Sequence, residues 1–308
     1  MVDKVLIATE KPFAESARNS MVKMFQEAGL EPVVLEKYTD PKDLLAAVAD
    51  VSAMVIRSDK VTKDVLEAGK NLKLVVRAGA GYDNVDCASA KARNVIVENT
   101  PGQNANAVAE LTIGMMVMIA RAKYSGKSGT ELKGKRLGVH ALGNIGTIVA
   151  SLGRAFGMDV CAFDPFLDQC VFDECCVGCI TKIEDLYSTC DYVSVHIPAT
   201  PETIKSINYA LLSKMKKGAA LINTARAEVI HEEELLKIME DRPDIKYASD
   251  IAPKNSAAFM EKFADRVFFT PKKMGAQTAE ANTNAGLAAA RQIIAYLKEG
   301  KVLNQVNP

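Results

Sequence analysis

The sequence lacks most features that mark a membrane, nucleic-acid-binding or disulfide-rich protein. It has no tryptophan, only three histidines and a formal net charge of zero, so it carries no basic footprint for nucleic acid or an anionic membrane. No apolar run approaches the length of a membrane-spanning helix, and the run within "MVDKVLIATE" is too short for a signal-peptide core. We therefore expect a cytoplasmic protein with neither a membrane nor a nucleic-acid partner.

The seven cysteines are more than average, but they form no clear metal or disulfide pattern. Five fall between Cys161 and Cys179, and Cys176-x-x-Cys179 alone could suggest a metal or redox pair. A structural zinc site needs a second pair of Cys or His ligands, which the chain does not supply cleanly. An odd count also argues against a disulfide framework. We expect reduced cysteines that mostly pack, and no metal, with metal binding as the minor alternative.

A chain of 308 residues is long for one domain and comfortable for two. Short apolar runs alternate with helical spacing over the first hundred residues, and a second series begins at "KRLGVHALGNIG" after the long apolar stretch "NAVAELTIGMMVMIARAK". Such alternation indicates βαβ units, and continuous apolar strands fit a sheet covered on both faces. We expect an α/β protein of two doubly wound parallel-sheet domains with a ligand cleft between them.

The stretch "KRLGVHALGNIGTIVASLGRAFGMDVCAFDP" has the order of a dinucleotide-binding unit. A strand leads into Gly143-Asn144-Ile145-Gly146 at the start of a helix, and a second strand ends at Asp164. The glycines would let the backbone approach a pyrophosphate, and an acid about 20 residues on would bind the adenine ribose and favour NAD over NADP. Ala141 stands where the full G-x-G-x-x-G pattern has its first glycine. The order of elements nevertheless predicts an NAD site.

At this point the chain resembles the D-2-hydroxyacid dehydrogenase family. The matching segments are "IRSDKVTKDVLEAGKNLKLVVRAGAGYDNVD", "NTPGQNANAVAELTIGMM", the nucleotide fingerprint, "INTARAEVIHEEEL" and "TPKKMGAQTAEA", in family order over nearly the whole chain. The resemblance implies a Rossmann NAD-binding domain, residues 101–280, inserted into a flavodoxin-like substrate domain, residues 1–100 plus 281–308. The chain looks most like the short members that oxidise 3-phospho-D-glycerate, lack a C-terminal serine-sensing module and form homodimers.

The resemblance also implies roles for single positions. Arg226 would bind and polarise a small phosphorylated hydroxy acid, because a guanidinium grips a carboxylate with two parallel hydrogen bonds. Arg57 looks suited to the 3-phosphate. The substrate-binding positions are Arg57, Ser58, Arg77, Ala78 and Gly79. The cofactor-binding positions are Ala80, Asn104, Gly143, Asn144, Ile145, Gly146, Asp164, His196, Ile197, Pro198, Thr224, Ala225, Asp250 and Gly275.

The chain departs from the family at the general acid/base. Most relatives have a histidine within the segment that reads "TPKKMGAQT" here, and an upstream glutamate that orients it; the glutamate position falls on Asn255. Counting back from "GAQT" places the histidine's counterpart at Lys273, and counting forward from "TP" places it at Lys272. We favour Lys273, because the Gly-Ala-x-Thr anchor follows directly.

A lysine has an ordinary pKa of about 10.4 and needs no carboxylate to keep its proton. Arg226, the NAD ring and partial burial would lower the lysine pKa towards a usable range, so we expect Lys273 to replace the histidine–glutamate pair. Two solvated lysines on an exposed turn are the alternative.

Two other functions stay open on the sequence alone. One is a glyoxylate or hydroxypyruvate reductase of the same family. The basic residues around Arg57 oppose this function, because they favour a phosphorylated substrate. The other is a non-catalytic, NAD-binding protein like the corepressors related to this family. Loss of the histidine and glutamate suits that second function, whereas the retained Arg226 and a lysine at the vacant position oppose it.

Overall fold

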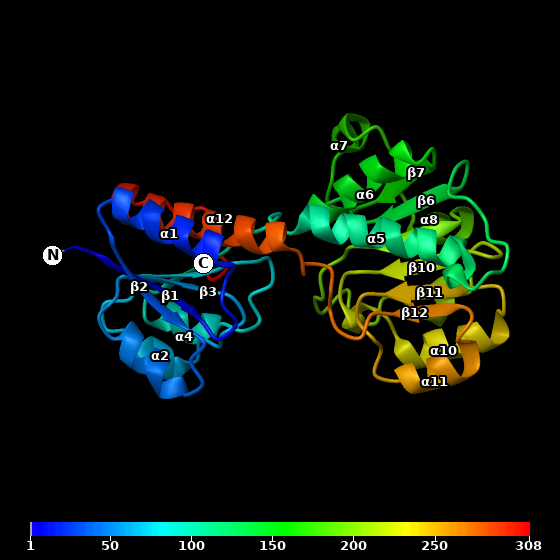
Figure 1. Cartoon of the computed structure of the whole chain (residues 1–308). Coiled ribbons are helices and arrows are strands. Elements are labelled where there is room, and N and C mark those ends of the chain that lie inside the picture. Colours follow the sequence, from blue (N-terminus) through cyan, green and yellow to red (C-terminus); the bar gives the residue numbers. More distant parts are fainter. Residues whose placement is uncertain (1) are drawn as a thin grey trace. The chain divides into compact units, whose positions relative to one another are not determined.

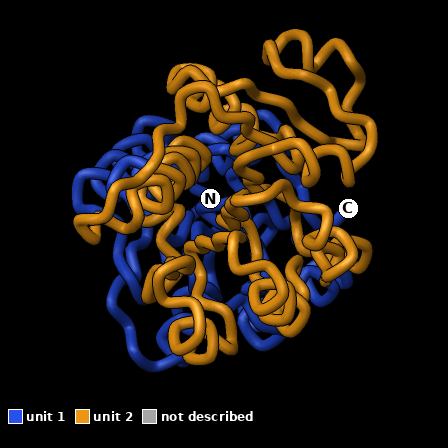
Figure 2. The backbone as a smooth tube through the Cα atoms, turned by 90° about the vertical axis from the view of Figure 1, so that its right-hand side faces the viewer, with its two compact units in different colours: residues 1–104, 278–308 blue, residues 105–277 orange. Residues whose placement is uncertain are grey.

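The computed structural model describes residues 2–308, which divide into two compact units. Unit 1 comprises residues 1–104 and 278–308, and unit 2 comprises residues 105–277. Figure 2 shows that unit 1, in blue, is built from both ends of the chain, with unit 2, in orange, as the segment between them. Among residues 2–308, no helix combines the length and the apolar character needed to cross a membrane.

Unit 1 is a parallel sheet between two helical layers (Figure 1). Over the described residues its five strands lie in the order β2-β1-β3-β4-β5. The strands are β1 (Lys4–Thr9), β2 (Glu31–Glu36), β3 (Ala53–Ile56), β4 (Leu74–Arg77) and β5 (Ile96–Asn99). The helices are α1 (Glu15–Glu27), α2 (Pro41–Val48), α3 (Lys63–Ala68), α4 (Cys87–Ala92) and α12 (Ala279–Glu299).

The two faces of this sheet are both apolar, which explains the layers. Successive side chains of a strand point to opposite faces. In β1, Val5 and Ile7 therefore pack with residues of α1 and α12, whereas Leu6 and Ala8 pack with residues of α2, α3 and α4. Helices α1 and α12 come from opposite ends of the chain and pack against each other on one face.

Unit 2 is a second parallel sheet, whose seven strands within the described residues lie in the order β12-β11-β10-β9-β6-β7-β8. The strands are β6 (Arg136–His140), β7 (Asp159–Phe163), β8 (Gly178–Cys179), β9 (Tyr192–Val195), β10 (Ala220–Asn223), β11 (Lys246–Ser249) and β12 (Val267–Phe269). The helices are α5 (Ala105–Ala120), η1 (Ala122–Tyr124), α6 (Asn144–Ala155), α7 (Gln169–Glu174), α8 (Ile183–Thr189), α9 (Tyr209–Leu212), η2 (Ala227–Val229), α10 (Glu232–Asp241) and α11 (Ser256–Phe263). The strand order reverses between β6 and β9, as in a Rossmann sheet. The expected fold class, two doubly wound parallel-sheet domains, is confirmed.

The cysteine-rich stretch forms α7 and β8 and is less packed than expected from the sequence. Cys170 and Cys176 are exposed, because they lie on the outer side of a short surface helix and the turn after it. Cys161 and Cys190 are buried, with their Sγ atoms 3.4 Å apart, and none of the seven is in a disulfide. Within residues 2–308, no group of three or more His, Cys, Asp or Glu side chains is placed to hold a metal ion.

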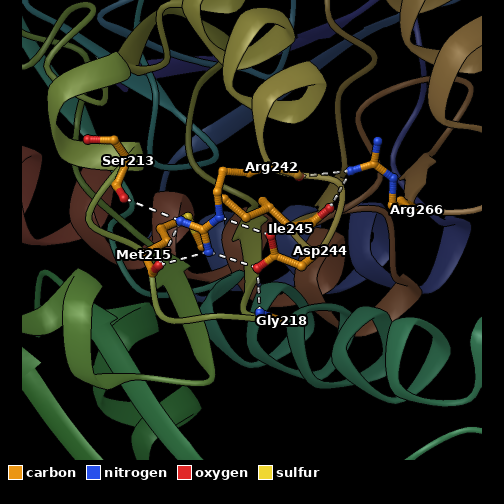
Figure 3. A network of polar contacts seen from close by, with 7 residues as sticks. All are labelled: Ser213, Met215, Gly218, Arg242, Asp244, Ile245 and Arg266. Carbon is orange, nitrogen blue, oxygen red and sulfur yellow. Dashed lines mark hydrogen bonds and ion pairs between the residues drawn. The ribbon is translucent and has the colours of Figure 1, made fainter.

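An arginine–aspartate network joins the loops that lead into β10, β11 and β12 (Figure 3). The Arg242 guanidinium forms two hydrogen bonds with the Asp244 carboxylate, at 2.9 and 2.7 Å, and the Gly218 N–H donates to the same carboxylate at 2.7 Å. Arg242 also donates to the carbonyls of Ser213 and Met215. Arg266 donates to the carbonyls of Arg242 and Ile245. The network stabilises the amino-terminal edge of the sheet, opposite the edge where catalytic groups of such folds gather.

Replacing Asp244 with asparagine should lower the free energy of unfolding by about 1–3 kcal/mol at neutral pH, because the charge-assisted pair with Arg242 is lost. The Arg242 hydrogen bond holds the pKa of Asp244 well below its ordinary value. This stabilisation is therefore present above the ordinary aspartate pKa and disappears as the pH falls through the lowered one. Denaturant unfolding at neutral and acid pH measures it. The exposed Asp265, changed to asparagine, is the matched control, and equal losses in both variants would contradict the prediction.

Candidate active site

The candidate residues of unit 2 follow the carboxyl ends of its strands. Arg226 comes after β10, Asp250 directly after β11, and Lys273 after β12. The turn that contains Ala141 and Gly143-Asn144-Ile145-Gly146, called the fingerprint turn below, comes after β6. Parallel strands end at one edge of a sheet, which is where ligands bind in open α/β folds. The fold thus brings together at one edge segments that lie 23 residues apart in sequence, as Asp250 and Lys273 do, and segments 83 residues apart, as Gly143 and Arg226 are.

Arg226 and Lys273 converge on one oxygen atom, the carbonyl oxygen of Ala225. The Arg226 Nη1 donates to it at 3.0 Å, and the Lys273 Nζ donates to it at 3.1 Å. Lys272 is exposed, and within residues 2–308 its side chain has neither a hydrogen bond nor an ion pair. Lys273 as a whole residue is exposed, while its ammonium group forms this part-buried hydrogen bond. The two lysines therefore differ in their contacts, and the one that the sequence register favours, Lys273, is the one that approaches Arg226.

Asp250 supplies a buried carboxylate beside these two cations. Its Oδ2 accepts the Gly275 N–H at 2.9 Å, and the residue has no exposed surface. Burial raises the pKa of Asp250, while the charges of Lys273 and Arg226 act in the opposite direction. Thr270 donates to the carbonyl of Asp250 at 2.6 Å. The end of β11 at Asp250 and the loop that carries Lys272 and Lys273 are therefore held to each other at both Thr270 and Gly275.

Two buried polar residues that the sequence reasoning missed position the segment before Arg226. Asn223 Nδ2 donates to the Arg226 carbonyl, and Asn223 Oδ1 accepts the Ala225 N–H, both at 3.0 Å. Thr112, on α5, donates to the Val108 carbonyl and lies 3.0 Å from the Thr224 hydroxyl. Since the single Thr112 hydrogen is used, Thr224 is the donor of that contact. The signal available in the sequence was a polar residue within an apolar segment: Asn223 ends the run "ALIN", and Thr112 lies within "AELTIGMM".

The fingerprint turn has the backbone of a phosphate-binding loop. Gly143 is the N-cap of α6, and no side chain caps this helix. A Cβ atom on Gly146 would overlap the carbonyl oxygen of Ala141, so only glycine fits there. Ala141 itself has a φ of 80°, the left-handed conformation that the family's glycine adopts easily and that costs an alanine about 1–2 kcal/mol. Ala141 therefore has a backbone conformation that a glycine would adopt at lower energy.

Changing Ala141 to glycine should raise the free energy of unfolding by about 0.5–1 kcal/mol, since relief of the left-handed strain exceeds the extra chain entropy of glycine. Changing Ala150, inside α6, to glycine should instead lower it by about 1 kcal/mol. Denaturant unfolding of both variants gives the comparison. Destabilisation by the Ala141 change would show that the strain is absent.

Asp164 follows β7 directly, as the sequence predicts, and its carboxylate also shapes the turn. Asp164 Oδ2 accepts the Leu142 N–H at 3.0 Å, and Oδ1 accepts the Phe166 N–H at 3.1 Å. The carboxylate therefore lies beside the fingerprint turn, where the acid of a dinucleotide site belongs.

Two of the three histidines of this unit, His140 and His196, are neutral at physiological pH. Burial lowers the pKa of His196 to about 3 and that of His140 to about 4. His196 Nε2 lies 2.6 Å from the Ser194 hydroxyl, and His140 Nδ1 lies 3.3 Å from the Tyr187 hydroxyl. A group with so low a pKa is almost never protonated near neutrality, so neither serves as an ordinary general acid there. His231 is the N-cap residue of α10, next to Glu233.

Several features fit a bound dinucleotide. Within residues 2–308, Asp250 Oδ1 and His196 Nδ1 are buried and have no hydrogen-bond partner. An unmet buried polar atom is costly, and a ligand with complementary groups would remove that cost. Together with the uncapped start of α6 and the space that Gly146 leaves, these atoms would hold the cofactor along the carboxyl edge of the sheet.

In unit 1, three of the positions predicted to bind substrate, Arg57, Arg77 and Gly79, lie together. Arg77 Nε donates to the Arg57 carbonyl at 3.0 Å, and a Cβ on Gly79 would overlap the Arg77 guanidinium. Gly79 thus leaves room for that side chain. Arg57 Nη1 donates to the carbonyls of Lys11 and Pro12.

Two asparagines that the sequence reasoning missed also shape this cluster. The Arg57 Nη2 donates to Asn282 Oδ1, so the start of α12 holds the guanidinium. Asn99 Nδ2 donates to the Ala80 carbonyl at 2.6 Å. Among residues 2–308, the side chains of Asn104, a predicted cofactor-binding residue, and Asn255, at the glutamate position, form no hydrogen bond. Only the course of the backbone places these two side chains.

Comparison with known proteins agrees with this arrangement. A family model described as the NAD-binding domain of D-isomer specific 2-hydroxyacid dehydrogenases matches residues 109–272. The crystal structure of an NAD+-bound 3-phosphoglycerate dehydrogenase from Entamoeba histolytica superposes with a TM-score of 0.89 at 41% identity, over 100% of this chain and 99% of that chain. The D-3-phosphoglycerate dehydrogenase of Methanocaldococcus jannaschii is 33% identical over 98% of this chain and 59% of its own length. The hydroxypyruvate reductase of Thermotoga maritima is 36% identical over 86% of this chain and 90% of its own length.

The chain spans 48–59% of the length of the three phosphoglycerate dehydrogenases that head these curated relatives. The family match nevertheless covers more than half of the present chain, and it includes the fingerprint, Arg226 and Asp250. NAD is accordingly the cofactor of this fold. The chain belongs to the D-isomer specific 2-hydroxyacid dehydrogenase family.

Proposed function

We propose that this chain oxidises 3-phospho-D-glycerate to 3-phosphohydroxypyruvate with NAD. The observation that carries the proposal is the convergence of Arg226 and Lys273 on the Ala225 carbonyl oxygen, beside the buried Asp250. This arrangement places a carboxylate-binding group and a proton-transfer group side by side. Oxidation of a 2-hydroxy acid requires both.

A bound NAD would supply the acceptor for the hydride at C2 of the substrate. Arg226 binds the substrate carboxylate with its guanidinium and polarises the C2 oxygen as it becomes a carbonyl. Lys273, in its neutral form, takes the hydroxyl proton at Nζ. In the reverse direction the Lys273 ammonium returns that proton to the oxygen. Asp250, Asn223 and Thr112 keep this part of the site in place.

The proposed substrate is a small phosphorylated hydroxy acid, and Arg57 is its phosphate ligand. Arg57 is half-buried, and its guanidinium carbon lies 5.3 Å from the centre of the Phe13 ring. Burial strengthens a charge-assisted contact to an anion. The relatives named D-3-phosphoglycerate dehydrogenase support this substrate. We also propose a cytoplasmic homodimer.

A second candidate function is reduction of hydroxypyruvate. This chain aligns with 90% of the length of the Thermotoga maritima hydroxypyruvate reductase, compared with 59% of the Methanocaldococcus jannaschii phosphoglycerate dehydrogenase. The reductase is therefore nearer in size to this chain. The hydrogen bonds of Arg226 and Lys273 to the same Ala225 carbonyl oxygen favour a catalytic role over a non-catalytic one.

The deciding experiment follows NADH formation from 3-phosphoglycerate, glycerate and D-lactate, and NADH consumption with 3-phosphohydroxypyruvate, hydroxypyruvate and glyoxylate. A kcat/KM highest for 3-phosphoglycerate supports the proposal. Preference for hydroxypyruvate over its phosphorylated form selects the reductase. Binding of NADH without turnover of any of these compounds selects the non-catalytic role.

Changing Arg57 to methionine should raise KM for 3-phosphoglycerate about tenfold or more, because one charge-assisted contact to the phosphate is lost. Turnover of glycerate, which has no phosphate, should be little affected. Arg93, exposed at the end of α4, is the matched control in the same unit when changed to methionine. Equal losses with both substrates would mean that Arg57 supports the fold of unit 1 and not the phosphate.

A further inference from the structure

A cavity of about 410 Å³ lies wholly within unit 1, at the carboxyl ends of β1 and β3. Glu10, the residue after β1, and Ser58 and Lys60, which follow β3, line it. The strand order β2-β1-β3-β4-β5 reverses between β1 and β3, and ligands of flavodoxin-like sheets bind at that reversal. The volume of the cavity lies in the range of small-molecule sites. Arg57, Arg77 and Gly79 do not line it, although Ser58 does.

The lining of the cavity combines an apolar wall with three charges. Leu44, Leu45 and Val65 supply the wall from α2 and α3. The charged groups are Glu10, Lys60 and Asp64, which are all exposed. None of these three side chains forms an ion pair or a hydrogen bond in the part of the chain that the structure describes.

Unpaired charges of both signs around one apolar wall match a ligand that itself carries both signs. Two carboxylates can take an ammonium group, and Lys60 can take a carboxylate. A phosphorylated ligand would meet two negative charges for one positive charge and is disfavoured. From this chemistry we propose that the cavity binds an α-amino acid with an apolar side chain.

Two residues that line the cavity, Tyr38 and Glu10, are coupled to Arg57 through one buried carboxylate, that of Asp59. Asp59 is 2% exposed, and its Oδ1 accepts the Tyr38 hydroxyl at 2.8 Å and the Glu10 N–H at 2.7 Å. Its Oδ2 accepts the Arg57 N–H at 3.2 Å. Tyr38 and Glu10 line the cavity, so an occupant that shifts either one acts on the residue that holds the Arg57 backbone. The bound amino acid therefore changes affinity for the phosphorylated substrate, a second effect that rests on the proposed function.

The test for binding is titration of the full chain with L-phenylalanine by isothermal calorimetry, without NAD or substrate. Saturable binding is expected, and it should weaken about tenfold in each of Glu10→Gln, Asp64→Asn and Lys60→Gln. Glu67→Gln, on the same helix as Asp64 but outside the cavity lining, is the matched control. Two analogues, 3-phenylpropionate without the ammonium and phenethylamine without the carboxylate, should bind about tenfold more weakly.

Absence of saturable binding, or equal affinity of the three lining variants and the wild type, would overturn the proposal. Binding of both analogues with the same affinity as L-phenylalanine would do the same. Displacement of L-phenylalanine by 3-phosphoglycerate in direct competition would make the cavity part of the substrate site. Binding that leaves KM for 3-phosphoglycerate unchanged would overturn the coupling through Asp59 alone. A chain that binds L-phenylalanine but oxidises no hydroxy acid would contradict the proposed function and leave the amino-acid site standing.

Discussion

Replacing Lys273 with alanine is expected to lower kcat by about 10²–10⁴-fold, the usual contribution of a general acid/base. Lys272→Ala is the matched control, because the two lysines are neighbours and only the Lys273 ammonium contacts the Ala225 carbonyl. Its kcat should stay close to that of the wild type. Steady-state NADH formation measures both variants.

One further substitution and one chemical rescue at Lys273 separate proton transfer from simple attraction. Lys273→Arg keeps the positive charge, but an arginine cannot give up its proton in the accessible pH range. If Lys273 transfers the proton, the arginine variant is as inactive as the alanine variant. Lys273→Ala should also regain part of its activity when a small primary amine is added. Turnover near that of the wild type in both lysine-to-alanine variants would show that neither lysine acts in the reaction.

The sequence was sufficient to predict the layered fold. Strands such as Val5–Ala8 and Leu221–Ile222 are continuously apolar, because both faces of each sheet are covered by helices. The elements from α7 to β8 were not predicted. The stretch "DQCVFDECCVGC" has neither helical nor strand periodicity, and its two exposed cysteines show how little packing constrains it.

For the candidate site, the sequence suggests residues but not their contacts. The register of the two lysines depends on where one extra residue is placed in a loop, which only the three-dimensional course of the chain decides. Ala141 interrupts the glycine pattern, and the sequence does not reveal its backbone conformation; in the structure its φ is 80°, which costs an alanine energy. Asn282 lies 225 residues from Arg57 in sequence, and no local pattern indicates their contact.

The sequence also left open whether any carboxylate replaces the glutamate of most relatives. Asp250 is the carboxylate that the structure places beside both cations, and its charge acts on Lys273 and Arg226. The contact differs from a histidine–glutamate pair, since the Lys273 ammonium donates to the Ala225 carbonyl. Asp250 therefore balances the charge of the site instead of orienting a ring. This difference leads to a prediction with opposite signs for stability and activity.

Changing Asp250 to asparagine should raise the free energy of unfolding at neutral pH and lower kcat/KM about 10–100-fold. Burial outweighs the two neighbouring cations, because the pKa of Asp250 lies above its ordinary value. A carboxyl group with a raised pKa stabilises the folded state most below its ordinary pKa, and that stability is lost as the pH rises through the raised one. The asparagine variant has no such loss, so its advantage appears at neutral pH and vanishes at acid pH.

Activity should fall because the unpartnered Asp250 Oδ1 is the acceptor that fits a bound cofactor, and an amide NH₂ in its place would face another donor. Without the carboxylate, the Lys273 ammonium also loses a counter-charge, so the rise of the oxidation rate with pH should move to lower pH. Unfolding at two pH values and a pH–rate profile measure the three effects, with Asp265→Asn as the control for removing one charge from the same unit. A variant that is both less stable at neutral pH and unchanged in its pH profile would show that Asp250 only anchors Gly275.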